Sequence, residues 1–205
     1  MNQVPSAEPH GLRPPPWEER ERYGLLNALV QTIRLVLFAP RRLFGRMPVG
    51  MGVRDPLLFA VALAVLGAML DWMWAQAGSN LPILLPPHWH QVVRGPYASA
   101  LDFLLSPLSA LILVYARAGI CHGVLTVLGG NRLGFEATLR VVAYSRAARL
   151  LSIVPFCGYL VGTIWELAVT IIGLARIHGG APWKSVLAVL AVLAVALVTW
   201  ATPLP

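Results

Sequence analysis

Five long apolar stretches, separated by short polar or glycine-rich turns, dominate the chain from residue 56 onwards. A helix needs about 20 apolar residues to cross the hydrocarbon core of a bilayer, and each stretch is close to that length. We therefore predict five transmembrane helices, at residues 57–76, 106–128, 135–154, 159–177 and 184–201. The third is the least apolar, because it contains Arg140, Arg146 and Arg149. If it did not span, the C-terminus would turn to the other side.

The second stretch is longer than one span requires. Apolar positions begin near residue 98, and a helix over 98–128 would be roughly 46 Å long at 1.5 Å per residue. Proline removes a backbone donor and crowds the preceding turn. We therefore expect Pro107 to divide the stretch into a lead-in and a span.

The residues before the first apolar stretch follow two other patterns. Residues 1–16 are polar and proline-rich, which predicts a disordered tail. Within 18–38, leucine, isoleucine and valine recur at helical spacing opposite Asn27, Gln31 and Arg34, which predicts an amphipathic helix. Two placements remain open for it: in the plane of the lipid headgroups, or packed against the cytoplasmic face of the bundle. Residues 17–55 then form a basic cytoplasmic segment, and 56–202 the five-helix domain.

The composition excludes an ordinary soluble domain. Hydrophobic residues make up 57% of the chain and charged residues only 12%, against about 25% charged residues in an average soluble domain. A soluble chain of this length exposes too much of its surface to water to hide that apolar area. The fold class we expect is therefore an all-α integral membrane protein, a bundle of about five transmembrane helices preceded by an N-terminal amphipathic helix.

The net charge of +7 is concentrated at one end of the chain. Eight of the sixteen basic residues lie in the first 55 positions, and the predicted outer segments contain only Arg94. The positive-inside rule then places the N-terminus in the cytoplasm and, for five spans, the C-terminus outside. Fifteen of the sixteen are arginine, a bias typical of GC-rich genomes, so we expect the bacterial cytoplasmic (inner) membrane.

The basic segment also suggests partners. It would attract anionic inner-leaflet headgroups, at about 1 kcal/mol per basic residue near the surface. The candidate lipid-surface contacts are Arg34, Arg41, Arg42 and Arg46. A cytoplasmic protein is a second candidate partner for this segment. Nucleic acid is not expected, because no nucleic-acid-binding motif accompanies the charge.

The sequence carries no recognisable catalytic motif. Hydrolase, kinase, nucleotide-binding and zinc-protease patterns are absent, so we do not expect an enzyme. The pair His88 and His90 offers two metal ligands where a structural or catalytic site needs at least three. We expect neither a metal nor a cofactor.

Charged residues inside the apolar stretches are the candidate functional residues, because charges at membrane depth are costly. The candidate network consists of Asp71, Asp102, Arg117, Arg146, Arg149 and Glu166. One interpretation is internal ion pairing that allows the bundle to insert. The other is a binding or translocation pathway for an anion, a proton or a lipid headgroup. Arg117 and Glu166 lie at nearly the same depth in their spans, and we predict that they pair directly or through one water.

Two small-residue motifs bear on oligomeric state. Gly119 and Gly123, and likewise Gly158 and Gly162, are four residues apart and would let helices approach closely. Packing within the chain is the simpler interpretation, and a homo-oligomer through either pair is the alternative.

Several short motifs together resemble a known family. The N-terminal ones are Pro16-Trp17-Glu18-Glu19, Thr32, Pro40, Phe44, Met47, Pro48 and Asp55-Pro56-Leu57. Those in 129–179 are the Gly129-Gly130 turn, Phe135 with Thr138, Arg140 with Ala143-Tyr144-Ser145, Pro155 with Gly158, Ile164-Trp165, and Gly173 with His178. This pattern, over about 17–202, resembles the Yip-domain family of Ypt/Rab-interacting five-span membrane proteins, in its bacterial branch.

The resemblance implies a five-helix domain with a cytoplasmic N-terminal region, and no catalytic residue. Eukaryotic members are associated with vesicle trafficking and Rab-type GTPases. This chain lacks their acidic Asp-Leu-Tyr-Gly-Pro element, which puts a GTPase partner in doubt.

Two functions from different classes follow. The first is a non-enzymatic scaffold or adaptor in membrane organisation or trafficking. The second is a small transporter or lipid-handling protein that uses the intramembrane arginine, glutamate and aspartate residues. An open cavity lined by those residues would favour the second, whereas a dry bundle with every charge paired would favour the first.

Overall fold

Every regular element of the protein is a helix over the residues that the computed structural model describes, which are 11–79, 96–154 and 158–201. The N-terminal elements are η1 (Pro16–Glu19), α1 (Arg20–Tyr23), α2 (Leu25–Phe38) and α3 (Pro40–Arg46). The bundle consists of α4 (Arg54–Ser79), α5 (Pro96–Val127), α6 (Gly134–Ser145), η3 (Arg146–Ile153), α7 (Gly158–Ile177) and α8 (Pro182–Ala201). The predicted all-α class is confirmed.

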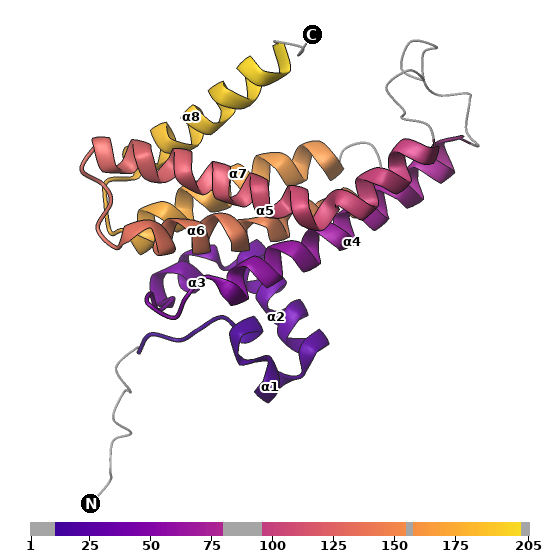
Figure 1. Cartoon of the computed structure of the whole chain (residues 1–205). Coiled ribbons are helices and arrows are strands. Elements are labelled where there is room, and N and C mark those ends of the chain that lie inside the picture. Colours follow the sequence, from indigo (N-terminus) through magenta and orange to yellow (C-terminus); the bar gives the residue numbers. More distant parts are fainter. Residues whose placement is uncertain (1–10, 80–95, 155–157, 202–205) are drawn as a thin grey trace, which may run out of the picture.

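The number of spans differs from the predicted five. Within the described residues, three helical segments are long and apolar enough to cross a membrane: Phe103–Val127, Gly158–Ile177 and Pro182–Thr199. They match the second, fourth and fifth predicted spans to within a few residues. Helix α4 covers the first, 57–76, and runs beside α5 (Figure 1).

The third predicted span, 135–154, is not a single helix. The α-helical part, α6, ends at Ser145, and the chain continues as the 3₁₀ helix η3. All of residues 137–148 are buried, because α6 contacts α4, α5 and α7. The segment is therefore an internal, broken helix surrounded by protein, which explains how a stretch with three arginines belongs to an apolar bundle.

Helix α5 corrects another prediction, because Pro107 does not divide it. The helix continues over 32 residues with the proline inside. A proline at this position cannot donate to the carbonyl four residues earlier, which belongs to Phe103. The Ser106 hydroxyl donates to that carbonyl instead, at 2.8 Å. A local side-chain donor thus replaces the missing backbone donor and lets the helix pass through.

The predicted amphipathic helix over 18–38 is also broken. Gly24 adopts a positive φ of 77° between α1 and α2, a conformation that glycine reaches without a steric penalty. The buried residues of α2 are Ala28, Thr32 and Val36, spaced four apart on one face. That face packs on the bundle, whereas Leu26 and Phe38 are exposed on other faces.

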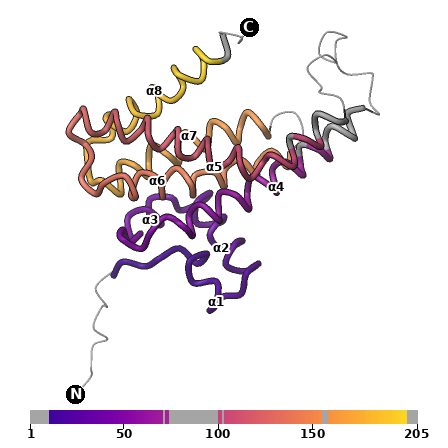
Figure 2. The backbone as a smooth tube through the Cα atoms, viewed as in Figure 1, coloured from indigo at the N-terminus to yellow at the C-terminus, as the bar shows by residue number. Residues whose placement is uncertain are grey.

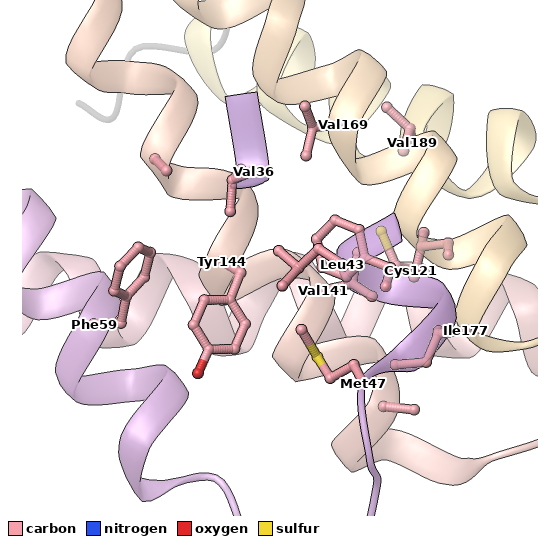
Figure 3. Close-up of a cluster of buried hydrophobic side chains, with 14 of the residues drawn as sticks. Val36, Leu43, Met47, Phe59, Cys121, Val141, Tyr144, Val169, Ile177 and Val189 are labelled. Carbon is pink, nitrogen blue, oxygen red and sulfur yellow. The ribbon is translucent and has the colours of Figure 1, made fainter. Parts of the chain in front are cut away.

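The core joins the N-terminal helices to the bundle. Val36 of α2 and Leu43 of α3 lie among side chains from α6 and α7, including Val141 and Val169 (Figure 3). A contact between aromatic rings extends the same core: the ring centres of Phe59 and Tyr144 are 5.0 Å apart. The trace in Figure 2 shows the same arrangement, with the indigo N-terminal helices against one side of the bundle. Residues 16–47 are therefore an integral part of the fold.

The two glycine pairs have different surroundings. A Cβ on Gly158 would lie 2.3 Å from the Leu151 carbonyl oxygen, and one on Gly162 would lie 2.9 Å from that of Ala148. This pair lets α7 approach η3 closely. A Cβ on Gly119 or Gly123 would have no neighbour within 4 Å among the described residues. A homo-oligomer through Gly119 and Gly123 stays a prediction.

Basic side chains gather at the end of the bundle where α5 meets α6 and α7 meets α8. Arg132 donates to the Gly179 carbonyl at 3.1 Å, and Lys184 to that of Gly129 at 3.2 Å. Arg41 of α3 and Arg176 of α7 line a shared groove beside these turns. Arg41 of α3 thus lies at the same end of the bundle as the two basic turns. The side of the membrane that this end faces stays a prediction.

Candidate functional site

A cluster of three arginines surrounds one buried carboxylate in the centre of the bundle. Arg117 Nη1 lies 2.7 Å from Glu166 Oε1, and Arg146 Nη1 lies 3.4 Å from the same oxygen. Arg149 Nε lies 3.6 Å from Glu166 Oε2. The Glu166 side chain is only 7% exposed. The predicted direct pair of Arg117 with Glu166 is therefore present, with two further arginines around it.

The broken third segment explains why Arg146 and Arg149 face the same carboxylate. In a 3₁₀ helix, side chains three residues apart lie directly above one another. Arg146, Arg149 and Ser152 follow that spacing along η3 and all line one pocket. An α-helical continuation of α6 would have rotated them away from one another by 60° per pair, about one sixth of a turn.

Arg149 is held by α7 as well as by Glu166. Its Nη1 donates to Thr163 Oγ1 at 3.1 Å, and its guanidinium lies 4.9 Å from the centre of the Tyr159 ring. Such a cation–π contact stabilises the charge without neutralising it. The Arg149 side chain is thus held by two residues of α7 as well as by Glu166, and 30% of it remains exposed.

The pocket beside this cluster lies between α4, α5, η3 and α7, and its volume is about 330 Å³. Its polar lining consists of Arg146, Arg149, Ser106, Ser109 and Ser152, with Tyr159 at the α7 side. Volumes above about 300 Å³ are typical of small-molecule sites. The arrangement offers positive charge and hydroxyl groups to an anionic group.

A second buried ion pair fastens the N-terminal helices to α6. Arg140 Nη2 donates to Glu18 Oε1, and Tyr144 donates to the same oxygen at 2.5 Å. The Arg140 side chain is 0% exposed and that of Glu18 only 3%. Arg140 Nη1 also donates to the Gly52 carbonyl at 2.9 Å. The structure thus places Arg140 in the interior of the protein.

The neighbours of Glu18 connect the N-terminal residues to α2 and α4. The Trp17 amide donates to Thr32 Oγ1 at 2.9 Å, and the Trp17 indole donates to the Asp55 carbonyl at 2.8 Å. Arg20 pairs with the Asp55 carboxylate at 2.7 Å. In the sequence, the motif Pro16-Trp17-Glu18-Glu19 is recognisable only as part of the family resemblance. Its partners lie up to 126 residues away along the chain, so no local signal revealed this role.

His178 lies at the basic end of the bundle and is 2% exposed. Its Nδ1 accepts from the amides of Arg132 and Leu133, at 3.3 and 3.4 Å, and its Nε2 lies 3.0 Å from Thr138 Oγ1. Burial, and to a lesser extent the charge on His122, lowers the pKa of His178 to about 4. The ring is therefore neutral at physiological pH and joins the turn before α6 to the end of α7.

Acidification should weaken the fold through His178. The unfolded chain binds the proton near pH 6.5, whereas the folded chain binds it only near pH 4. The stability that His178 contributes is thus fully present above about pH 6.5 and is lost as pH falls towards 4. We expect a loss of about 3 kcal/mol in the free energy of unfolding across this window, measured by thermal unfolding in detergent.

His178→Asn is the matched variant for that measurement, since the amide oxygen can still accept from the two backbone amides but does not titrate. The stability of this variant should depend less on pH between 4 and 6.5 than that of the wild type. Equal slopes for the two proteins would contradict the role of His178.

The structure places the other predicted site residues as follows. Arg117, Arg146, Arg149 and Glu166 form the central cluster. Asp71 and Asp102 belong to α4 and α5, but their side chains lie outside the described ones. Among the candidate lipid-surface residues, Arg34, Arg41 and Arg42 are exposed and Arg46 is partly buried. The described residues contain no group of three His, Cys, Asp or Glu side chains placed to hold a metal.

Comparison with known proteins identifies the family. The family model of the Yip1 domain matches residues 34–202, which covers α3 to α8 and the last residues of α2. Searches of curated proteins and of solved structures found no match. The bacterial branch of the family stays a prediction. The match and the three candidate spans describe a multi-pass membrane protein, and the chain belongs to the Yip1 domain family.

Proposed function

We propose that this Yip1-domain protein is a non-enzymatic lipid-handling or transport protein that binds an anionic group inside its bundle. The observation that carries the proposal is the open pocket lined by Arg146 and Arg149. An open cavity lined by the intramembrane charged residues is the feature expected of such a function. A dry bundle with every charge paired was the criterion for a scaffold.

The charges at the pocket support an anionic ligand. Among the described side chains, Glu166 is the one carboxylate in contact with the three guanidinium groups. Positive charge at membrane depth is costly unless it is paired. A phosphate or carboxylate group in the pocket would pair the remaining charge, and arginine binds such groups with two parallel hydrogen bonds.

A soluble headgroup analogue tests the proposal without any contribution from an acyl chain. The protein, purified in an uncharged detergent, is titrated with glycerol 3-phosphate, and the thermal unfolding temperature is followed. Glycerol with sodium chloride at equal ionic strength is the reference. A ligand that binds only the folded state raises the unfolding temperature in a saturable manner, and we expect this for glycerol 3-phosphate alone.

Two variants make the test specific. Arg149→Gln should weaken the apparent affinity about tenfold or more, since a hydrogen bond to a charged group contributes about 1.5–3 kcal/mol. Arg34→Gln makes the same charge change on the exposed surface of α2 and should have little effect. The proposal fails if glycerol phosphate stabilises no more than the reference, or if both variants behave like the wild type.

A scaffold or adaptor is the second candidate function, favoured by the surface of α2. This helix keeps Leu25, Leu26, Val30 and Phe38 exposed although its opposite face is docked on the bundle. Arg34, Arg41 and Arg42 are exposed on the same part of the chain. Apolar side chains flanked by arginines suit an anionic membrane surface or a cytoplasmic protein.

A further inference from the structure

An apolar cavity adjoins the arginine pocket. It has a volume of about 440 Å³ and is lined by Met69, Trp72, Ala100, Phe103 and Leu104. These residues belong to α4 and α5. Trp72 and Phe103 line both cavities. The two cavities are therefore neighbours: one contains the guanidinium groups of η3, and the other is a groove lined by apolar side chains only.

The groove is placed to receive a chain from the membrane. Its lining side chains are exposed on the surface of α4 and α5, with Leu104 at 72%, Met69 at 47% and Trp72 at 44%. In a membrane-spanning helix pair, such a surface is in contact with lipid tails. A charged pocket next to an apolar groove of this kind has the amphipathic pattern of a phospholipid.

We propose that the site binds one anionic phospholipid, with the headgroup phosphate on Arg146 and Arg149 and an acyl chain in the groove of Met69, Trp72, Ala100, Phe103 and Leu104. This inference rests on the proposed function and names its ligand class. A soluble anion would use the arginines alone and leave the groove without a role. The shared lining by Trp72 and Phe103, together with the charge, selects a lipid.

Photolabelling locates the acyl chain directly. The full chain is placed in phosphatidylcholine nanodiscs that contain a trace of phosphatidylglycerol with a photoactivatable acyl chain. A parallel sample contains phosphatidylcholine with the same photoactivatable chain. Peptide mapping should show labelling of the α4 and α5 groove by the anionic lipid about tenfold above that by the zwitterionic lipid, because only the former brings a net negative charge to the arginines.

Two kinds of variant separate the headgroup from the chain. In Arg146→Gln/Arg149→Gln, the preference for the anionic lipid should disappear while total labelling of the lipid-facing surface persists. Ala100→Phe fills the exposed groove without changing a charge. It should reduce groove labelling by the anionic lipid severalfold and leave stabilisation by glycerol 3-phosphate at the wild-type level.

Equal labelling by the two lipids in the wild type would overturn the inference, since it would identify the groove occupant as bulk lipid. If glycerol 3-phosphate binds but the anionic lipid is not enriched, the ligand is a soluble anion. The proposed function then stands and the lipid assignment fails. If neither probe depends on Arg149, both fail together.

Discussion

Replacing Glu166 with leucine is expected to destabilise the bundle by about 3–5 kcal/mol, the range observed when one member of a buried ion pair is removed. The side chain is nearly buried and contacts Arg117, Arg146 and Arg149. Its loss leaves three positive charges without their shared partner. Thermal unfolding of the purified protein in detergent measures the change.

The arginines around Glu166 provide the matched variants. Arg117→Leu should cost only about 1 kcal/mol, because this side chain is 32% exposed and exposed pairs contribute little. Glu166 also keeps two partners in that variant. The double variant should be milder than Glu166→Leu alone, since it removes one of the charges left unpaired. Additive losses would show that the two residues are not coupled.

Glu18→Ala is expected to detach the N-terminal helices from the bundle, with a loss of about 3 kcal/mol or more. Arg140 is fully buried and would keep the Gly52 carbonyl and the more distant Glu136, whose carboxylate is 3.7 Å away. Tyr144 would lose its acceptor as well. Limited proteolysis should cut residues 11–50 of this variant faster than those of the wild type, and thermal unfolding should occur at a lower temperature.

Glu19→Ala is the control for that experiment, because it removes a carboxylate from the neighbouring position of η1 without touching the pair. Glu18→Gln should fall between the two, since it keeps an acceptor for Tyr144 but loses the charge. Unchanged protease resistance in Glu18→Ala would mean that apolar packing alone holds the N-terminal helices in place.

The predictions that succeeded depended on regular helix geometry. The rise per residue was enough to bring Arg117 and Glu166 to one depth, because each lies in a continuous, apolar helix. Hydropathy located the segments Phe103–Val127, Gly158–Ile177 and Pro182–Thr199 for the same reason. These features require no knowledge of tertiary contacts.

The predictions that failed depended on local departures from regular geometry. Apolar content does not reveal the change from α6 to η3, and this change aligns Arg146 with Arg149. A proline normally ends a helix. Helix α5 continues past Pro107 because the Ser106 hydroxyl is oriented towards the Phe103 carbonyl, which a sequence pattern does not reveal. A spacing of three between Arg146, Arg149 and Ser152 was a signal of the 3₁₀ helix, but it is also compatible with an α-helix.

The burial of Glu18 against Arg140 could not be predicted because it is a long-range contact. The two residues are 122 positions apart, and either of them could have been satisfied by water or headgroups. Hydrophobic periodicity in α2 left both placements open for the same reason. The core in Figure 3 shows that one face of α2 packs on the bundle, whereas contact of its exposed face with lipid headgroups stays a prediction.

The broken segment of α6 and η3 has a consequence for how the chain is made. Its arginines have partners on both sides in the order of synthesis: Glu18 leaves the ribosome long before Arg140, whereas Glu166 follows Arg146 by 20 residues and Arg149 by fewer. When synthesis has reached only the end of η3, Arg146 and Arg149 are present but Glu166 of α7 has not yet been made. The ion pairs of this segment therefore have all their partners only once both η1 and α7 have been synthesised.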